Sequence, residues 1–181
     1  SESITDVNSY IKLGSVLPDA NMAWRNDFRW RNFNFGFMVS ARLGGVVFSR
    51  TQAMLDYYGV SEVSAAARDA GGVMINGGDL VDANKWYTAI GGGNSVPQYY
   101  TYSATNVRLQ EASIGYTIPK KTLGDICEIT LSLVGRNLWM IYNKAPFDPE
   151  TIATTGNYYQ GVDYFMSPSM RNIGFNLRVK F

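Results

Sequence analysis

Five stretches of the chain alternate between apolar and polar or small side chains, as strands with one apolar face do. The clearest is the segment 172–181, in which every second residue is apolar from Ile173 to Phe181 without an exception. Its length matches the ~9–11 residues that a tilted strand needs to cross a bilayer. The pattern predicts an all-β, antiparallel fold with strands at about 24–30, 34–43, 107–118, 127–137 and 172–181. Taken alone, this alternation fits a half-buried strand of a soluble β-sandwich equally well.

One of the five stretches changes phase. Its apolar positions from Ala112 to Ile118 are even-numbered, whereas Val107 and Leu109 are odd-numbered. A β-bulge adds one residue to a strand and restores the facing of the side chains beyond it. We therefore expect a bulge or bend near Gln110–Glu111.

The connections alternate between short and long. Arg31–Asn32 and Pro119–Ile126 are short, whereas 44–106 and 138–171 are long. Most connections in compact soluble domains have ~4–6 residues. Outer-membrane barrels instead keep short turns on the periplasmic side and long loops outside. The rhythm favours a transmembrane β-barrel whose last strand runs inward.

The aromatic residues sort by strand end under this orientation, as interfacial girdles do in barrels. We expect an inner belt of Trp30, Phe33, Phe35, Tyr116 and Phe181. We expect an outer belt of Trp24, Tyr102, Trp139 and Tyr142. Aromatic side chains in the core of a sandwich would not need to sort in this way.

The first long connection predicts short helices in an extracellular loop. Segments 49–58 and 61–70 have helical composition, and Ser61 is a suitable N-cap for the second. Asp79 and Asp82 lack the spacing of a calcium-binding EF-hand, so a solvated loop is the favoured interpretation there.

Composition excludes several functions. Charged residues make up 17% of the chain, the formal net charge is +1, there is no His, and Cys127 is the only cysteine. The sequence therefore predicts no nucleic-acid binding, no Ser-His-Asp or Cys-His catalysis, no internal disulfide, no structural zinc or other metal site, and no cofactor. We predict that the chain is not an enzyme.

Five strands do not close a barrel, and an open sheet edge leaves N–H and C=O groups unsatisfied in lipid, at several kcal/mol each. We expect the remaining strands to come from elsewhere. The chain is then part of a larger barrel, as the tail-like opening at 10–14 suggests, or one copy in an oligomeric pore-forming barrel. A soluble carbohydrate-binding β-sandwich is the third alternative.

Several motifs resemble those of SusC/RagA-type TonB-dependent outer-membrane transporters, and together they cover nearly the whole chain. The string from Asn106 to Pro119 is similar to the family's penultimate hairpin. Two earlier segments, 13–19 and 26–33, resemble family patterns that precede it. The remaining resemblance lies in Gly135, Arg136, Asn137 and Leu138, followed by Phe147, Asp148, Pro149 and Glu150.

The resemblance implies that 1–181 is the C-terminal part of the barrel domain, with about five strands of a 22-stranded barrel and without the plug and early strands. It implies a bacterial outer-membrane location, in contact with lipid and with the remainder of the same barrel. It also implies a SusD-like surface lipoprotein and TonB as partners, the latter through the absent N-terminal part. The cargo implied is oligosaccharide or peptide.

Candidate contacts with cargo or lipoprotein are loop aromatics, whose rings suit sugars and peptides, although packing of such rings on one another is the commoner role. These candidates are Trp86, Tyr87, Tyr99, Tyr100, Tyr158 and Tyr159. Arg136 and Asn137 are interpreted as hydrogen-bonding residues that fix a strand end. Asp148–Glu150 is interpreted as a loop anchor, and Phe181 resembles the terminal aromatic residue that barrel-assembly machinery recognises.

Overall fold

The computed structural model describes residues 11–93, 96–153, 156 and 159–181. The opening segment 1–10, which includes Tyr10 of the tail-like stretch predicted at 10–14, therefore lies outside the described residues. The chain forms two compact units, each assembled from separated stretches. The strand unit comprises Pro18–Gly44, Ala104–Asp148 and Pro168–Phe181. The helical unit comprises Gly45–Ser103, Pro149–Ser167 and the residues before Pro18.

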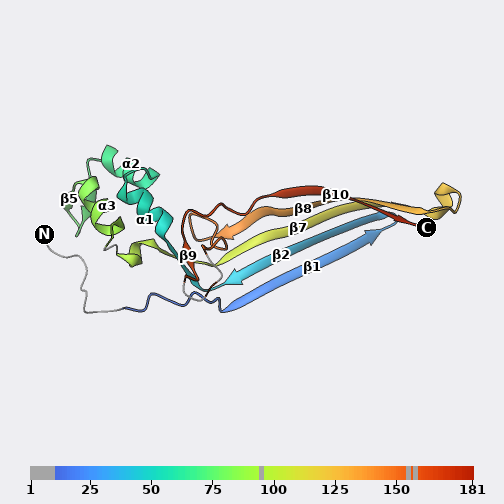
Figure 1. Cartoon of the computed structure of the whole chain (residues 1–181), viewed down its shortest axis with the longest axis horizontal. Helices are drawn as coiled ribbons and strands as arrows, with labels where there is room; N and C mark the ends of the chain where they lie inside the picture. Colours follow the sequence, from blue (N-terminus) through green and yellow to red (C-terminus); the bar gives the residue numbers. More distant parts are fainter. Residues whose placement is uncertain (1–10, 94–95, 154–155, 157–158) are drawn as a thin grey trace. The chain divides into compact units, whose positions relative to one another are not determined.

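The strand unit is one antiparallel sheet, in which the strands lie side by side in chain order (Figure 1). Its strands are β1 (Ala20–Trp30), β2 (Phe33–Leu43), β7 (Asn106–Ile118), β8 (Glu128–Asn143) and β10 (Asn172–Lys180). They overlap the five predicted ranges. β1 begins at Ala20 instead of 24, and β8 continues to Asn143 instead of ending at 137.

The register of the five strands places apolar residues opposite apolar residues along a row that crosses the sheet. One row of paired residues runs through Phe28, Phe35, Ile114, Leu133 and Phe175. Because side chains of paired residues point to the same side of a sheet, this row builds one continuous apolar face. The sequence alternation is therefore expressed as two faces of opposite character.

The row of positions next to it is polar or small throughout. It runs through Arg29, Asn34, Gly115, Ser132 and Asn176, each paired with the next. A register slip of one residue in any strand would mix the two rows. The match of rows across five strands shows that the register follows the two-residue period of the sequence.

A bulge in β7 keeps the apolar face intact where the sequence changes phase. Met38 pairs with Glu111 and the next residue, Val39, pairs with Leu109, so Gln110 is the extra residue. The bulge predicted near Gln110–Glu111 is confirmed. Its consequence is that Val107 and Leu109 remain on the same face as the even-numbered apolar residues that follow.

The two short connections are tight. β1 and β2 are joined by Arg31 and Asn32 alone, and Arg31 has a positive φ of 53°. Between β7 and β8, a 3₁₀ turn at Lys120–Leu123 ends at Gly124, whose φ of 68° suits a residue without a side chain. Both turns lie at the same end of the sheet, since β2 and β7 are antiparallel neighbours.

The helical unit contains three helices, α1 (Arg50–Tyr57), α2 (Glu62–Asp69) and α3 (Ala83–Gly91). Short strands accompany them, namely β3 (Val46–Ser49), β4 (Val73–Ile75), β5 (Asp79–Val81), β6 (Thr101–Ser103) and β9 (Val162–Asp163). The first two helices fall within the ranges predicted to be helical. Tyr102, predicted to lie in the outer aromatic belt, lies in β6, outside the five-stranded sheet. No helix in the described part of the chain is long and apolar enough to span a membrane.

The helical unit has its own small core. The buried members are Ala53, Ala83, Tyr87, Ile90, Val96 and Tyr100. Ser49 links this core to β9, because its hydroxyl donates to the buried carboxylate of Asp163 at 2.7 Å and accepts from the Gln52 backbone N–H at 3.0 Å. One side chain thus both caps α1 and pairs a buried charge.

We predict that Ser49→Ala loosens α1 more than Ser61→Ala loosens α2. Both hydroxyls cap a helix, Ser61 by accepting from the Ser64 N–H at 3.1 Å. Only Ser49 also satisfies a buried carboxylate, whose loss of a partner costs roughly 1–3 kcal/mol beyond the cap. Hydrogen–deuterium exchange of each helix in the whole protein measures the difference, and equal protection losses would contradict it.

Candidate functional site

The apolar face of the sheet is unusual because it remains exposed. Trp24 is 63% exposed and Phe175 is 79% exposed, although both belong to continuous rows of apolar side chains. The other large exposed members include Met22, Phe28, Trp30, Phe33, Phe35, Ile114, Tyr116, Leu131, Leu133, Trp139, Ile141, Tyr142, Ile173, Leu177 and Val179. Contiguous apolar surface of this extent marks contact with protein or membrane. A β-sandwich would bury these side chains on a second sheet, and none covers them among the described residues.

Side-chain hydrogen bonds cross the polar face of the sheet from strand to strand. Arg29 Nε donates to Asn34 Oδ1 at 3.1 Å, and Asn34 Nδ2 donates to Thr117 Oγ1 at 3.1 Å. Thr117 and Thr130 hydroxyls lie 3.0 Å apart. The chain of contacts joins β1, β2, β7 and β8. This face is therefore a polar surface with hydrogen bonds between its side chains, opposite in chemistry to the other face.

Charges of both signs lie on the same polar face. Arg25 Nε approaches Asp27 at 2.9 Å, and its guanidinium lies 3.7 Å from Glu111 Oε1. Arg136, a motif residue, pairs with the other oxygen of Glu111 at 3.2 Å. Such exposed pairs contribute little stability each. Their position places the motif arginine on the polar face, within a network that joins β1, β7 and β8.

The motif that begins at Gly135 forms an irregular step in β8. Asn137 has a φ of 51°, a left-handed conformation that asparagine tolerates better than most residues. Its Nδ2 donates to the Met170 carbonyl at 3.2 Å, just ahead of β10. A side chain at Gly135 would meet Leu138 Cδ2 at 2.6 Å, so glycine leaves space for that leucine. The motif residues thus shape the strand where it faces the bulge of β7.

Asp148 forms a buried ionic anchor with Arg108. The distance between Arg108 Nη2 and Asp148 Oδ1 is 2.9 Å, and the two side chains are 5% and 8% exposed. Asp148 Oδ2 also accepts from the Ser169 hydroxyl at 2.5 Å and from its backbone N–H at 3.3 Å. Three segments that are far apart in sequence meet at this carboxylate. They are β7, the segment after β8 and the segment before β10.

The neighbours of Asp148 in the same motif have different surroundings. The Phe147 carbonyl accepts from Asn143 Nδ2 at 2.7 Å, which closes the end of β8. Pro149 is fully buried, and Glu150 is exposed. Asp148 therefore holds a structural ion pair, whereas the residues around it position the connection.

The loop aromatics divide into buried and exposed groups. Tyr100 is 2% exposed and Tyr87 is also buried, so both pack in the helical core. Trp86 and Tyr99 meet edge to face at 5.7 Å, and Tyr99 and Tyr159 are exposed. Tyr158 lies outside the described residues. Burial leaves Tyr100 no free ring face for stacking, whereas Trp86, Tyr99 and Tyr159 remain candidate contacts.

Two further candidates are placed as follows. Phe181 follows β10 and is highly exposed. Asp82 is the N-cap of α3 and accepts from the Lys85 N–H at 3.0 Å, while Asp79 begins β5. In the described parts of the chain, no cluster of three or more His, Cys, Asp or Glu residues forms a metal site.

The chain is similar in sequence to TonB-dependent receptors. It is 25% identical to TonB-dependent receptor P3 of Formosa agariphila over 93% of this chain and 17% of that protein. It is 24% identical to TonB-dependent receptor P26 of the same organism over 99% of this chain and 19% of that protein. The chain thus spans less than a fifth of the length of these relatives. No family model matches the sequence.

The fold is also similar to part of a solved transporter structure. A structure of the RagAB peptide importer in its open–open state superposes with a TM-score of 0.67 at 16% identity, over 93% of this chain and 18% of that one. The sequence is thus similar to a segment of TonB-dependent receptors, and the fold is similar to a segment of the RagAB peptide importer structure. The resemblance to SusC/RagA-type TonB-dependent receptors that the motifs indicated is confirmed.

We predict that Asp148→Asn destabilises the protein by about 3 kcal/mol, because it leaves the Arg108 guanidinium buried without its counter-charge. The double variant Arg108→Met with Asp148→Leu should recover much of this loss, since neither charge is then buried. Denaturant unfolding of the purified protein in detergent measures both values. A double variant that is less stable than Asp148→Asn would contradict this assignment.

We predict that Asn137→Val is more harmful than Asn137→Gly. Both variants lose the hydrogen bond to Met170, but only valine must hold a positive φ, at a cost of about 1–2 kcal/mol. The same denaturant measurement distinguishes them. Equal stabilities would show that the left-handed backbone of Asn137 is not a constraint.

Proposed function

We propose that this chain is the C-terminal part of a β-barrel in the bacterial outer membrane, and that the barrel is a TonB-dependent active transporter. The observation that carries the proposal is the exposed apolar face of the sheet, which pairs Phe28, Phe35, Ile114, Leu133 and Phe175 in one row. Such an apolar face is compatible with the hydrocarbon of a bilayer, and the opposite, polar face is compatible with the lumen of a barrel.

The edges of the sheet support a larger barrel. Among the described residues, β1 and β10 pair with a neighbour on one side only. Their free N–H and C=O groups need partners within hydrocarbon, because no water satisfies them there. We infer that the remainder of a barrel, of 22 strands by analogy with the family, supplies the strands on both sides. If β1 and β10 instead paired with the edge strands of other copies of this chain, the result would be an oligomeric pore, which is the second candidate function.

The orientation follows from the connections. The turns at Arg31–Asn32 and Lys120–Leu123 are short and lie at one end of the sheet, which we assign to the periplasm. The helical unit interrupts the chain at the other end of β2 and β7, as an extracellular loop does. The anchor of Arg108 and Asp148 then belongs to the outer rim of the barrel.

The cargo and partners are inferred from the relatives. We propose import of oligosaccharides or peptides together with a SusD-like surface lipoprotein, with TonB as the energy-coupling partner. The resemblance to a peptide importer and to TonB-dependent receptors supports this assignment. The proposal includes no catalysis, which agrees with the use of Asp148 in a buried ion pair. The exposed Tyr99 and Tyr159 and the half-buried Trp86 are the proposed contacts for cargo or lipoprotein.

Two substitutions at neighbouring residues of β10 test which side of the strand faces lipid and which faces the lumen. Leu177→Arg places a charge on the proposed lipid face and should cost ~2–4 kcal/mol if it lies near the bilayer midplane. Arg178→Leu alters the proposed lumen face and should be milder. The amount of folded barrel in the outer membrane, measured by heat-modifiable migration on gels, reports insertion. Equal effects of the two substitutions would contradict the assigned facing.

A further inference from the structure

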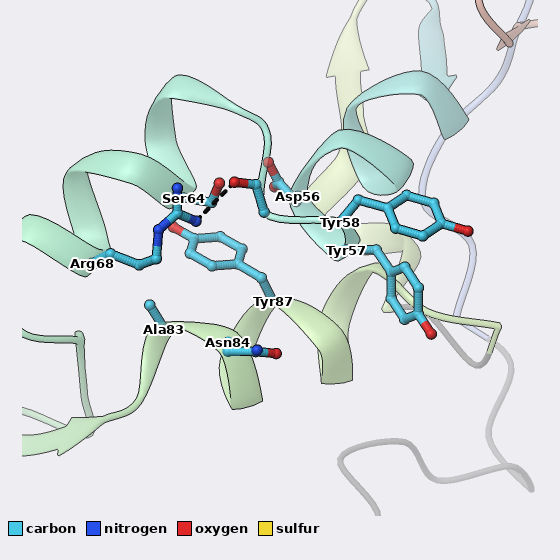
Figure 2. Close-up of a pocket in the computed structure, with 9 residues that line it drawn as sticks. Asp56, Tyr57, Tyr58, Ser64, Arg68, Ala83, Asn84 and Tyr87 are labelled. Carbon is cyan, nitrogen blue, oxygen red and sulfur yellow. Dashed lines mark hydrogen bonds between the residues drawn. The ribbon is translucent and has the colours of Figure 1, made fainter.

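A small pocket lies within the helical unit, between α1, α2 and α3 (Figure 2). Its volume is about 120 Å³. A cavity of roughly 150 Å³ accommodates a benzene ring, so this pocket has room for a solute of about six non-hydrogen atoms. Its polar lining side chains are Asp56, Ser64, Arg68, Asn84 and Tyr87, with Tyr57 and Tyr58 beside them. None of these side chains is used by the sheet or by its rim anchor.

Asp56 brings a buried negative charge to the pocket. Its residue is 5% exposed, and its Oδ1 accepts one hydrogen bond from Gln52 Nε2 at 2.9 Å. Within the described residues, no Lys or Arg nitrogen lies within 4.0 Å of this carboxylate. A buried carboxylate without a cation is costly, so a positively charged group in the pocket would be stabilised.

Tyrosine side chains surround this carboxylate. Burial, and after it the negative charge of Asp56, raises the pKa of Tyr87, Tyr100 and Tyr102. These phenols therefore stay neutral, and none of them supplies a charge of its own to the pocket. A cationic ligand at Asp56 would meet neutral hydroxyls and aromatic rings, both of which are compatible with an ammonium group.

Arg68 brings a positive charge to the same pocket from α2. Its Nη1 donates to the Gly59 carbonyl at 2.8 Å, the contact drawn as a dashed line in Figure 2. Its other guanidinium donors make no hydrogen bond to the described residues, and no carboxylate there lies within 4.0 Å. Figure 2 shows the Tyr87 ring directed from α3 toward the α2 side, where Arg68 lies. A ligand carboxylate would find donors from both side chains.

The negative charge of Asp56 and the positive charge of Arg68 together favour a ligand that carries one positive and one negative group. A simple anion such as phosphate would be attracted by Arg68 but repelled by Asp56. A simple amine would be attracted by Asp56 but repelled by Arg68. We propose that this pocket binds a small zwitterion of the α-amino acid class, with its ammonium group at Asp56 and its carboxylate at Arg68. This site goes beyond the proposed transport function, because none of the proposed cargo contacts Trp86, Tyr99 and Tyr159 lines the pocket.

Isothermal titration of the whole protein in detergent tests the proposal, with glycine and L-alanine as probes. Acetate, methylamine and glycerol are the matched controls, since they carry one charge or none. We expect saturable binding of the two zwitterions and binding of each control that is weaker by about tenfold or more, the equivalent of one lost charged hydrogen bond. Glycerol binding as tightly as L-alanine, or no binding of either zwitterion, would overturn the proposal.

Variants locate the site. Arg68→Gln and Asp56→Asn should each weaken L-alanine by about tenfold or more. Asp69→Asn and Lys85→Gln, exposed charges of α2 and α3 outside the pocket, should leave it unchanged. Because Asp56 is buried, circular dichroism and thermal unfolding must first show that its variant is folded. Arg68 is exposed, so unchanged binding in Arg68→Gln by itself contradicts the proposal.

Discussion

In the proposed membrane barrel, the rest of the structure depends on one constraint: neighbouring strands must satisfy each other's backbone hydrogen bonds in a layer that contains no water. In hydrocarbon every N–H and C=O must find a partner in the protein, and side chains must then divide between lipid and lumen. The sheet meets both demands at once. Its strands are paired in sequence from β1 to β10, and most ladder positions carry side chains of one kind. An exposed apolar face, which is a liability in water, becomes the favourable surface in a membrane.

Two irregular features lie within the strands, on the side from which the long connections leave the sheet. Gln110 is the bulged residue of β7, and Asn137 with its left-handed backbone lies opposite, in β8. Beyond them the strands lead into long connections that need separate anchoring. The buried pair of Arg108 and Asp148 supplies it by holding Ser169 next to the start of β10. The family-like motifs are thus accounted for by backbone geometry and loop attachment, without chemistry of their own.

The sequence predicted those features that repeat at short range. Period-two alternation located the strands, and a parity change located the bulge at Gln110. The extension of β8 to Asn143 was missed because 138–142 is apolar without alternation. α3 was not predicted, because the segment around Asp82 was interpreted as a solvated loop, whereas the Asp82 side chain caps this helix. The pairing of Arg108 with Asp148 joins residues 40 positions apart, which no local pattern reveals. For the same reason, the pocket at Asp56 and Arg68 became visible only once three helices were in place.

Site-directed spin labelling along β10 tests the central claim most directly, after the native cysteines of the protein, Cys127 among them, are replaced by serine so that each introduced cysteine is labelled alone. In lipid vesicles, labels at Phe175, Leu177 and Val179 should be accessible to oxygen dissolved in the bilayer. Labels at Asn176 and Arg178 should be more accessible to a water-soluble relaxation agent, giving a two-residue period out of phase with the first. Uniform accessibility along the strand, or oxygen accessibility with the opposite phase, would contradict the account.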